Sequence, residues 1–226
     1  MKQVQSMYDE TGLYFSKTRK KTYGETTNNW PITQKYLEMV KPGGSVLDVG
    51  CGDGRLVSGL PKGVSYYGFD FSKTLLAQAK LTYPKHKFEY GDAVDPAVWD
   101  KLPKFEAVFC VAVIHHLPER KHQLYLLREM KKHVKPGGLL FITTWNLWQE
   151  RMIQKGIERD KLITGSVVEM SFNKTPGRYV VAMDLPYLVQ LMSEAGWSVE
   201  RICYSDHEGQ ATDIQHGSNL VAIARG

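Results

Sequence analysis

Short apolar runs alternate along this chain with segments whose apolar residues recur at helical spacing. The run at 105–113 is continuously apolar, as expected for a strand buried on both faces. Strand and helix in alternation predict parallel strands joined by right-handed crossovers. We expect strands at 45–49, 65–70, 87–90, 105–113, 138–145, 197–203 and 220–224. We expect helices between them, at about 53–60, 72–83, 119–133 and 184–196.

Two segments fall outside this alternation. An amphipathic stretch at 4–15 and a helix starting at Pro31 precede the first strand, and we expect them to form an N-terminal helical cap at 1–41. Between 146 and 183 the periodicity fades, which is typical of a functional insertion or lid near a substrate site. The length of 226 residues suits a single domain, 1–226, with a full core.

The turn after the first strand carries the most chemistry. Residues 45–54 read Ser-Val-Leu-Asp-Val-Gly-Cys-Gly-Asp-Gly, so three glycines, Gly50, Gly52 and Gly54, follow a β-branched run. Such a turn lets the backbone approach a ligand closely, and a helix opening at about Asp53 would present its free N–H groups there. The spacing G-x-G-x-G differs from the G-x-G-x-x-G of dinucleotide-binding proteins.

Acids follow the next two strands. Asp70 stands at the end of the second strand, where α/β nucleotide folds place a carboxylate that accepts the ribose hydroxyls. Asp92 follows the third strand in the same way. Turn acids can simply cap helices. Together with Asp48 of the first strand, however, these acids mark the ends of three successive strands, which favours a nucleoside site.

The glycine turn resembles the first motif of class I S-adenosylmethionine-dependent methyltransferases, V-L-D-V-G-C-G-x-G. The resemblance implies an α/β, Rossmann-like, seven-stranded sheet with an antiparallel last strand and helices on both faces. It also implies S-adenosylmethionine as the cofactor. The cofactor-binding residues that it implies are Arg19, Asp48, Gly50, Cys51, Gly52, Asp70, Phe71, Asp92, Ala93, Val111 and His116.

A finer resemblance concerns the methyl acceptor. Residues 14–19, Tyr-Phe-Ser-Lys-Thr-Arg, and the pair Trp30-Pro31 resemble the tRNA wobble-uridine carboxyl methyltransferases, which esterify 5-carboxymethyluridine. The chain departs from that family at Tyr14, which replaces a histidine, and at 180–183, where members often have a histidine and an aromatic residue. The substrate residues implied are Tyr14, Trp30, Trp145, Asn146, Arg178 and Tyr179. A small-molecule O- or N-methyltransferase is the alternative, and a cofactor-binding subunit without activity is a third possibility.

A carboxylate acceptor needs little help from the enzyme. With a pKa near 4 it is ionised at neutral pH and can attack a sulfonium methyl group directly. Arginines would then position the anions, and the resemblance places Arg19 by the methionine carboxylate and Arg178 by the acceptor. His115 would be the base if the acceptor were a hydroxyl or an amine, so His115 and Arg178 are the catalytic candidates. The alternatives are a packing role for the histidines and surface ion pairs for the arginines.

Composition limits the cellular location and the binding partners that we expect for the chain. The chain is 42% hydrophobic and 23% charged, with no apolar run near the roughly 18 residues of a membrane span, so we expect a cytoplasmic protein without membrane contact. The three cysteines form no C-x-x-C pair, and we expect neither a disulfide nor a metal site. The formal charge of +5 includes a basic cluster at Lys17–Lys21 that suits tRNA phosphates, and an activating protein partner is possible. The cations of the helix at 119–133 suit a solvated face.

Overall fold

The computed structural model describes residues 5–6, 8–10, 28–172 and 175–226, with the backbone alone at 171–172 and 175–178. Residues 5–6 and 8–10 are helical and lie within the predicted helix at 4–15. The elements that follow are α2 (Pro31–Leu37), β1 (Ser45–Val49), η1 (Arg55–Gly59), β2 (Ser65–Asp70), α3 (Lys73–Thr82), β3 (Lys87–Tyr90), α4 (Pro96–Trp99), β4 (Phe105–Val111), η2 (Ile114–His116), α5 (Arg120–His133), β5 (Val134–Trp145), α6 (Glu150–Ile153), η3 (Arg159–Lys161), β6 (Val167–Phe172), β7 (Thr175–Val181), α7 (Leu185–Glu194), β8 (Ser198–Ser205), β9 (Ala211–Thr212) and β10 (Asn219–Arg225).

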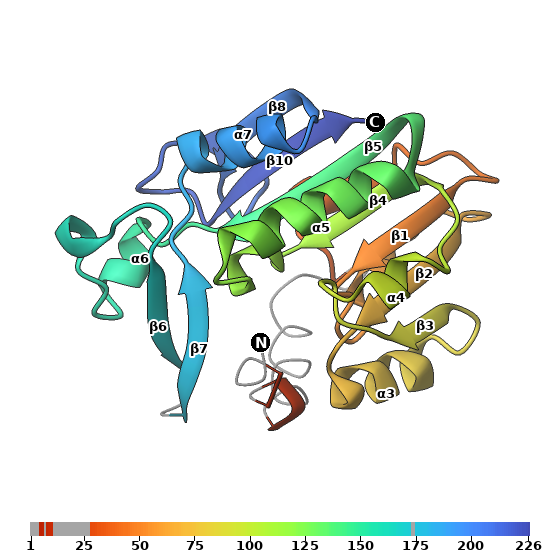
Figure 1. The fold of residues 1–226 in the computed structure, drawn as a ribbon, viewed down its shortest axis with the longest axis horizontal. Coiled ribbons are helices and arrows are strands. Elements are labelled where there is room, and N and C mark those ends of the chain that lie inside the picture. Colours follow the sequence, from red (N-terminus) through yellow and green to blue (C-terminus); the bar gives the residue numbers. More distant parts are fainter. Residues whose placement is uncertain (1–4, 7, 11–27, 173–174) are drawn as a thin grey trace.

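The central sheet has the strand order β3-β2-β1-β4-β5-β10-β8-β9 (Figure 1). Strands β1 to β5 pair in parallel, whereas β10 runs antiparallel to both of its neighbours, β5 and β8. The predicted α/β class, with an antiparallel last strand, is therefore confirmed. One strand more than the predicted seven is present in this sheet because β9 adds two residues to its edge, within the connection after β8.

The order of the strands creates a crevice. The chain moves from β1 outward to β2 and β3, and then returns to place β4 on the other side of β1. The connections that leave β1 and β4 therefore diverge at the carboxyl ends of these strands. Open α/β sheets bind their ligands at such a point of reversal.

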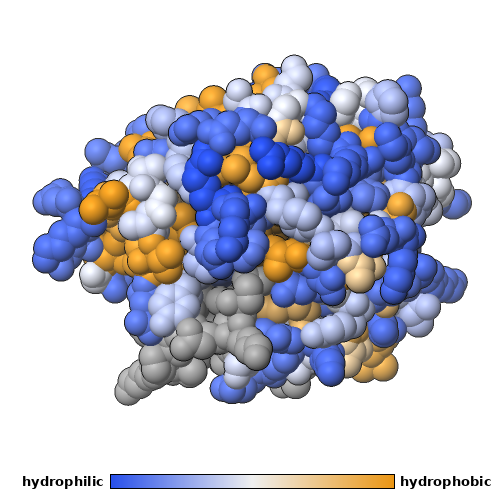
Figure 2. Space-filling view, in the orientation of Figure 1, coloured by the Kyte–Doolittle hydropathy of each residue, from blue (hydrophilic) through white to orange (hydrophobic). Residues whose placement is uncertain are grey.

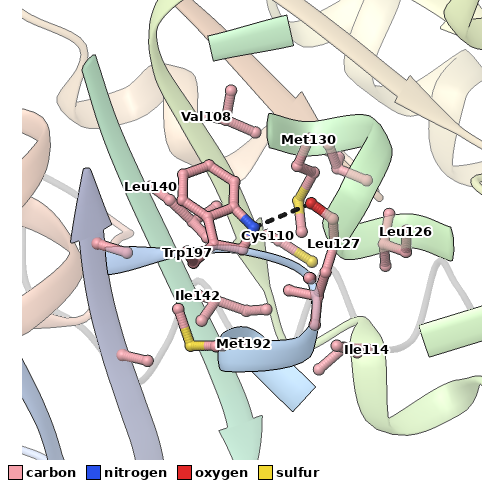
Figure 3. Packing of buried hydrophobic residues seen from close by; sticks show 14 of the residues in the cluster. Val108, Cys110, Ile114, Leu126, Leu127, Met130, Leu140, Ile142, Met192 and Trp197 are labelled. Carbon is pink, nitrogen blue, oxygen red and sulfur yellow. Dashed lines mark hydrogen bonds between the residues drawn. The ribbon is translucent and has the colours of Figure 1, made fainter. Parts of the chain in front are cut away.

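Helices cover both faces of the sheet, and each face has its own apolar core. On one face α5 and α7 pack through Leu126, Leu127 and Leu191, and the indole N–H of Trp197 donates to the carbonyl of Leu127 over 2.9 Å (Figure 3). On the other face the apolar core joins residues of α2 and α3 to the sheet, and α3 lies against β2 and β3. Burial on both faces explains why the strands read as nearly continuous apolar runs.

Side-chain caps fix the starts of two helices where the sequence predicts them. The Ser72 hydroxyl accepts the N–H of Leu75 at the start of α3, and the Asp184 carboxylate accepts the N–H of Tyr187 at the start of α7. Each cap satisfies a backbone donor that the first helical turn leaves unpaired.

The prediction of an α-helix at 53–60 was wrong in the type of helix. The segment forms the five-residue 3₁₀ helix η1, preceded by Gly54 in the left-handed conformation with φ 77°. Only six residues separate Gly54 from Pro61, and Ser58 and Gly59 are poor helix formers, so an α-helix has no room to propagate. The turn itself, rather than a helix N-terminus, therefore faces the crevice.

The segment at 146–183 is more regular than its sequence indicates. It contains α6, η3 and an antiparallel hairpin in which Val167 pairs with Val181, with a small apolar core around Leu147, Met170 and Val180. The sequence does not reveal β7 because Pro176 and Gly177 interrupt its strand pattern. Figure 2 shows hydrophobic side chains gathered on the side that carries α6 and β6, where Ile163 is 70% exposed.

None of the helices among the described residues is both long and apolar enough to cross a bilayer. The described residues contain no group of three or more histidine, cysteine, aspartate or glutamate side chains arranged to hold a metal ion. Cys51, Cys110 and Cys203 are free thiols.

Candidate functional site

Two adjoining pockets form one cleft across the carboxyl ends of β1, β2 and β4. Figure 1 shows the β6–β7 hairpin and the helical residues 8–10 on the side toward which these strands point. The β2 pocket is lined by Tyr8, Gly50, Gly52, Phe69, Asp70, Phe71, Leu75, Gly91, Asp92, Ala93, Val111, Ala112, Val113, His116 and Leu117. The α2 pocket is lined by Tyr8, Asn29, Trp30, Thr33, Asp48, Gly50, Cys51, Gly52, Asp53, Arg55, Leu56, Leu75, Val111, Ala112 and Trp145.

Asp70 ends β2 and organises the β2 pocket. One carboxylate oxygen accepts the N–H of Gly52 and the other accepts the N–H of Ser72, each over 2.8 Å. Burial raises the pKa of Asp70 to about 6, although these two backbone donors oppose the rise. Each oxygen keeps a second lone pair, so the group can still accept hydroxyl protons from a ligand.

Asp48 is the buried acid of the α2 pocket. It lies within β1, where the Tyr66 hydroxyl donates to its carboxylate over 2.7 Å. Burial raises the pKa of Asp48 to about 7, whereas the Tyr66 hydrogen bond and the positive charge of Arg55 lower it. A cationic ligand group beside Asp48 would favour the ionised carboxylate.

The third strand-end acid, Asp92, closes the far side of the β2 pocket. Its carboxylate accepts the N–H of Val94 over 3.1 Å, which fixes the turn after β3. Phe71 and Ala93 line the pocket beside it. These apolar side chains, with the Asp92 carboxylate beside them, suit a flat heterocycle that carries an amino group.

Ala112 lines both pockets and has an unusual backbone conformation. Its φ is 58°, the one positive value among the described residues other than glycine. The conformation is held because its N–H donates to both the carbonyl and the hydroxyl of Thr143 on β5. Strained residues of this kind cluster at functional sites. An alanine gives no sign of this in the sequence, and we did not predict Ala112 as a site residue.

The two histidines after β4 differ in position. His116 lines the β2 pocket, with its Nδ1 at 3.1 Å from the Tyr179 carbonyl and its Nε2 at 3.2 Å from the Tyr8 hydroxyl. Because a carbonyl can only accept, Nδ1 carries the proton of the neutral ring, and Nε2 accepts the proton of Tyr8. His116 thus joins the N-terminal residues to the hairpin.

His115 lies behind this surface. It is fully buried, its ring centroid is 5.0 Å from that of Trp145, and it lines neither pocket. Trp145 therefore stands at the cleft, in the α2 pocket. The His115 ring therefore packs against a side chain that lines the cleft.

The structure brings together every predicted cofactor residue that it describes. These are Asp48, Gly50, Cys51, Gly52, Asp70, Phe71, Asp92, Ala93, Val111 and His116. Arg19 and Tyr14 lie outside the described residues, as does the basic cluster at 17–21. Of the predicted substrate residues, Trp30 and Trp145 line the α2 pocket.

Asn146, Arg178 and Tyr179 are the remaining predicted substrate residues. Asn146 is fully buried, donates to the carbonyls of Ile214 and Gly217, and accepts the N–H of Trp148, so its amide holds the chain together. Tyr179 reaches the site through its backbone carbonyl. The backbone at Arg178 pairs with Met170 in the hairpin, one residue before Tyr179.

The cations of α5 are largely engaged within the protein. Arg120 pairs with Glu194 over 2.6 Å, Lys132 pairs with Glu129 over 2.7 Å, and Lys131 donates to the Gly196 carbonyl. Acids on and near this helix therefore neutralise much of its charge, in agreement with the predicted solvated face.

Residues that we did not predict complete the α2 pocket. Asn29, Thr33 and Arg55 come from the start of α2 and from η1. No motif marks them, since Asn29 and Thr33 precede the glycine turn in the sequence and reach the cleft through the packing of α2. Arg55 could have been noticed as the first residue after the last turn glycine.

The model of a protein family described as "Methyltransferase domain" matches residues 27–202 of the chain. The chain belongs to this methyltransferase family. Among curated relatives it is 29% identical over 164 residues to the tRNA (carboxymethyluridine(34)-5-O)-methyltransferase of Saccharomyces cerevisiae, a match that covers 71% of this chain and 55% of the relative. The chain thus spans about half the length, or less, of the curated relatives it matches.

Solved methyltransferases share the fold. A S-adenosylmethionine-dependent methyltransferase from Methanosarcina mazei superposes with a TM-score of 0.68 at 18% identity, over 87% of this chain and 97% of that one. A methyltransferase from Haloferax volcanii, solved in complex with the activator Trm112, superposes with a TM-score of 0.65 at 16% identity, over 96% of each chain. Family and fold together confirm the predicted enzyme class and its cofactor, S-adenosylmethionine.

The cleft of this methyltransferase has the chemistry that the cofactor requires. Among the described residues, a Cβ atom added at Gly52 would meet only the Leu75 side chain, at 3.8 Å. The turn therefore leaves space in the pocket for a ligand to lie against the backbone of Gly52. The Thr33 hydroxyl is buried against the α2 pocket, and no group in the described part of the chain forms a hydrogen bond with it. Buried acids and an unpartnered donor suit a polar, partly cationic ligand.

Proposed function

We propose that the protein uses S-adenosylmethionine to esterify the carboxymethyl group of the wobble uridine in tRNA. The observation that carries this proposal is the 29% identity, over 71% of the chain, to the yeast enzyme named for that reaction. A shared fold alone would not distinguish among acceptors, because one methyltransferase scaffold serves many of them.

In this proposal each pocket holds one part of the cofactor. The β2 pocket takes the adenosine, with Asp70 accepting the ribose hydroxyls and Asp92 beside the adenine amino group. The α2 pocket takes the methionyl part, with Asp48 beside its positive charge. S-adenosylmethionine, when bound, supplies a methyl group on a cationic sulfur.

The histidines after β4 support an acceptor that is already ionised. His115 packs behind Trp145, and both ring nitrogens of His116 are engaged, by Tyr8 and by Tyr179. A carboxylate needs no general base, since its pKa near 4 leaves it ionised at neutral pH. The residues around it need only align it with the methyl group and exclude water.

The N-terminal segment 1–41 and the segment 146–183 also have roles in this proposal. We assign 1–41 as the cap over the cofactor and 146–183 as the lid over the acceptor, within one methyltransferase domain. The contact between His116 and the Tyr179 carbonyl supports a link between this lid and the cleft. Arg178, next to Tyr179, would position the acceptor carboxylate, and Arg19 would serve the cofactor.

The partners follow from the substrate. The basic residues Lys17, Lys20 and Lys21 would contact tRNA phosphates. The Haloferax volcanii neighbour was solved with an activator protein, so a protein partner that stabilises this chain or contributes tRNA contacts is part of the proposal. We place the reaction in the cytoplasm.

The direct test is nucleoside mass spectrometry. The protein, with and without a Trm112-type activator, is incubated with S-adenosylmethionine and tRNA whose wobble uridine carries the free carboxymethyl group. We expect the 5-carboxymethyluridine mass to rise by one methylene and mild alkali to return it, because an ester hydrolyses and an N-methyl group does not. An unchanged nucleoside in both incubations would instead favour a small-molecule acceptor.

A binding measurement separates the two acceptor classes independently. If Lys20 and Lys21 contact phosphates, tRNA affinity should fall steeply with salt, and replacing both with alanine should flatten that slope by roughly one unit per lost contact. S-adenosylmethionine binding should stay intact. Wild-type protein without saturable, salt-sensitive tRNA binding, even with the activator, would contradict the tRNA proposal.

A further inference from the structure

Charge is distributed unevenly in the cleft. Among the described residues that line it, Asp48, Asp53, Asp70 and Asp92 are acidic, whereas Arg55 is the one permanently charged cation. The methionyl part of the cofactor carries an ammonium and a carboxylate. The acids suit the ammonium, and the carboxylate requires a positively charged donor group.

Arg55 is fixed at the wall of the α2 pocket. It begins η1, directly after Gly54, and its guanidinium carbon lies 6.0 Å from the centre of the Trp30 ring. Trp30 in turn precedes α2 and lines the same pocket. Contact with an aromatic face limits the orientations of the guanidinium, whose planar fork of N–H donors matches a carboxylate.

Thr33 stands on the same wall, in the first turn of α2. The residue is 1% exposed, and its hydroxyl has no hydrogen-bond partner among the residues that the structure describes. A buried hydroxyl without a partner is costly, so a ligand group that accepts from it would remove this cost. Arg55 and Thr33 thus offer a charged fork and a hydroxyl donor to one region of the pocket.

We propose that Arg55 and Thr33 form the subsite that binds the amino-acid carboxylate of the cofactor, opposite Asp48, which faces the ammonium. The cleft then recognises both charges of the amino-acid end at once. The favourable effect of the Arg55 charge on the ionisation of Asp48 supports their proximity. This inference rests on the proposed cofactor site and does not depend on the proposed acceptor. It differs from the sequence-based prediction, which gave the carboxylate to Arg19.

The test compares two ligands that differ at the amino-acid end. S-adenosylhomocysteine carries the carboxylate and the ammonium, whereas 5′-deoxy-5′-methylthioadenosine lacks both. By calorimetry, Arg55→Gln should weaken S-adenosylhomocysteine binding on the order of tenfold to a hundredfold, the effect of one lost hydrogen bond to a charged group. Binding of methylthioadenosine should change by less than about twofold. Thr33→Val, which keeps the shape of the side chain, should show the same selectivity with a smaller loss.

The control variant is Lys62→Gln, which removes an exposed cation from the same connection between β1 and β2. It should leave the affinity for both ligands unchanged. Equal losses for the two ligands in Arg55→Gln, or no loss, would overturn the inference, as would a raised KM for tRNA with intact S-adenosylhomocysteine binding. If the wild-type protein bound neither ligand, the proposed cofactor site itself would fail.

Discussion

The two pockets of the cleft are built in different ways. Most of the β2 pocket is lined by residues at or just after the ends of β1, β2, β3 and β4, and Tyr8 and Leu75 complete it. The α2 pocket shares the glycine turn, but its other walls are Trp30, Thr33 and Trp145, which belong to segments far apart in the sequence. In the function proposed above, recognition of the nucleoside would thus depend mainly on strand ends. Methyl transfer would depend on how remote segments pack.

The largest effect should come from the β2 pocket. Asp70→Ala removes the acceptor proposed for two ribose hydroxyls and also frees the N–H groups of Gly52 and Ser72. We expect S-adenosylhomocysteine affinity, measured by calorimetry, to fall on the order of a hundredfold, since hydrogen bonds to charged groups contribute about 1.5–3 kcal/mol each.

Asp70→Asn is the matched control, because it keeps one oxygen and the shape of the side chain. It should lose less affinity than Asp70→Ala while both variants retain a cooperative thermal transition. Unchanged affinity in Asp70→Ala would remove Asp70 from the ligand site and break the contrast between the two pockets.

The second effect concerns Asp48 and the pH dependence of stability. Its folded pKa of about 7 lies above the ordinary value of 3.8, so the folded state holds the proton more tightly than the unfolded state. Stability from this group is fully present below pH 4 and is lost as pH rises through 7. The loss amounts to at most about 4 kcal/mol, at roughly 1.4 kcal/mol for each pKa unit.

The measurement is the melting temperature of the ligand-free protein between pH 5 and pH 8. It should fall with rising pH in the wild type and fall less in Asp48→Asn, which cannot ionise. The Asp70 pKa of about 6 adds a smaller contribution of the same sign, centred at lower pH. Equal slopes in the wild type and in Asp48→Asn would show that Asp48 is not buried as described.

The same contrast separates what the sequence reveals from what it does not. The α/β class, the helix starts at Ser72 and Asp184, and the glycines and acids of the β2 pocket are predictable because each depends on residues that lie close together in the sequence. The hairpin β6–β7 was missed because Pro176 and Gly177 disturb the pattern of β7. Ala112 and Thr33 were missed because their roles come from a backbone angle and a helix orientation that only the folded chain defines.

A smaller effect is expected at the contact between His116 and Tyr8. Tyr8→Phe removes the hydroxyl, and His116→Asn keeps a donor toward the Tyr179 carbonyl while losing the acceptor for Tyr8. Each should raise the KM for S-adenosylmethionine about fivefold, as for one neutral hydrogen bond of about 1 kcal/mol. The double variant should be no worse than either single variant, because all three lack the same bond. Additive losses would mean that the two residues act independently.

The smallest effect should be at His115. If the acceptor is a carboxylate, His115→Gln should change kcat by less than about twofold, and kcat with both substrates saturating should be flat from about pH 6 upward. Thermal melting of the variant controls for the loss of buried packing against Trp145. A steep rise through the histidine range that His115→Gln abolishes would favour a hydroxyl or amine acceptor.

The position of β10 has a consequence for how the protein is made. This strand follows β8 and β9 along the chain, yet it occupies an interior place in the sheet, between β5 and β8. Until the ribosome has released it, β5 has no partner on that side, and β8, β9 and α7 have no attachment to the parallel strands through the sheet. Strands β1 to β5 can assemble during synthesis, with one open edge that is prone to pairing with other chains. Completion of the fold, and with it the wall that carries Trp145, must therefore wait until translation has passed residue 225.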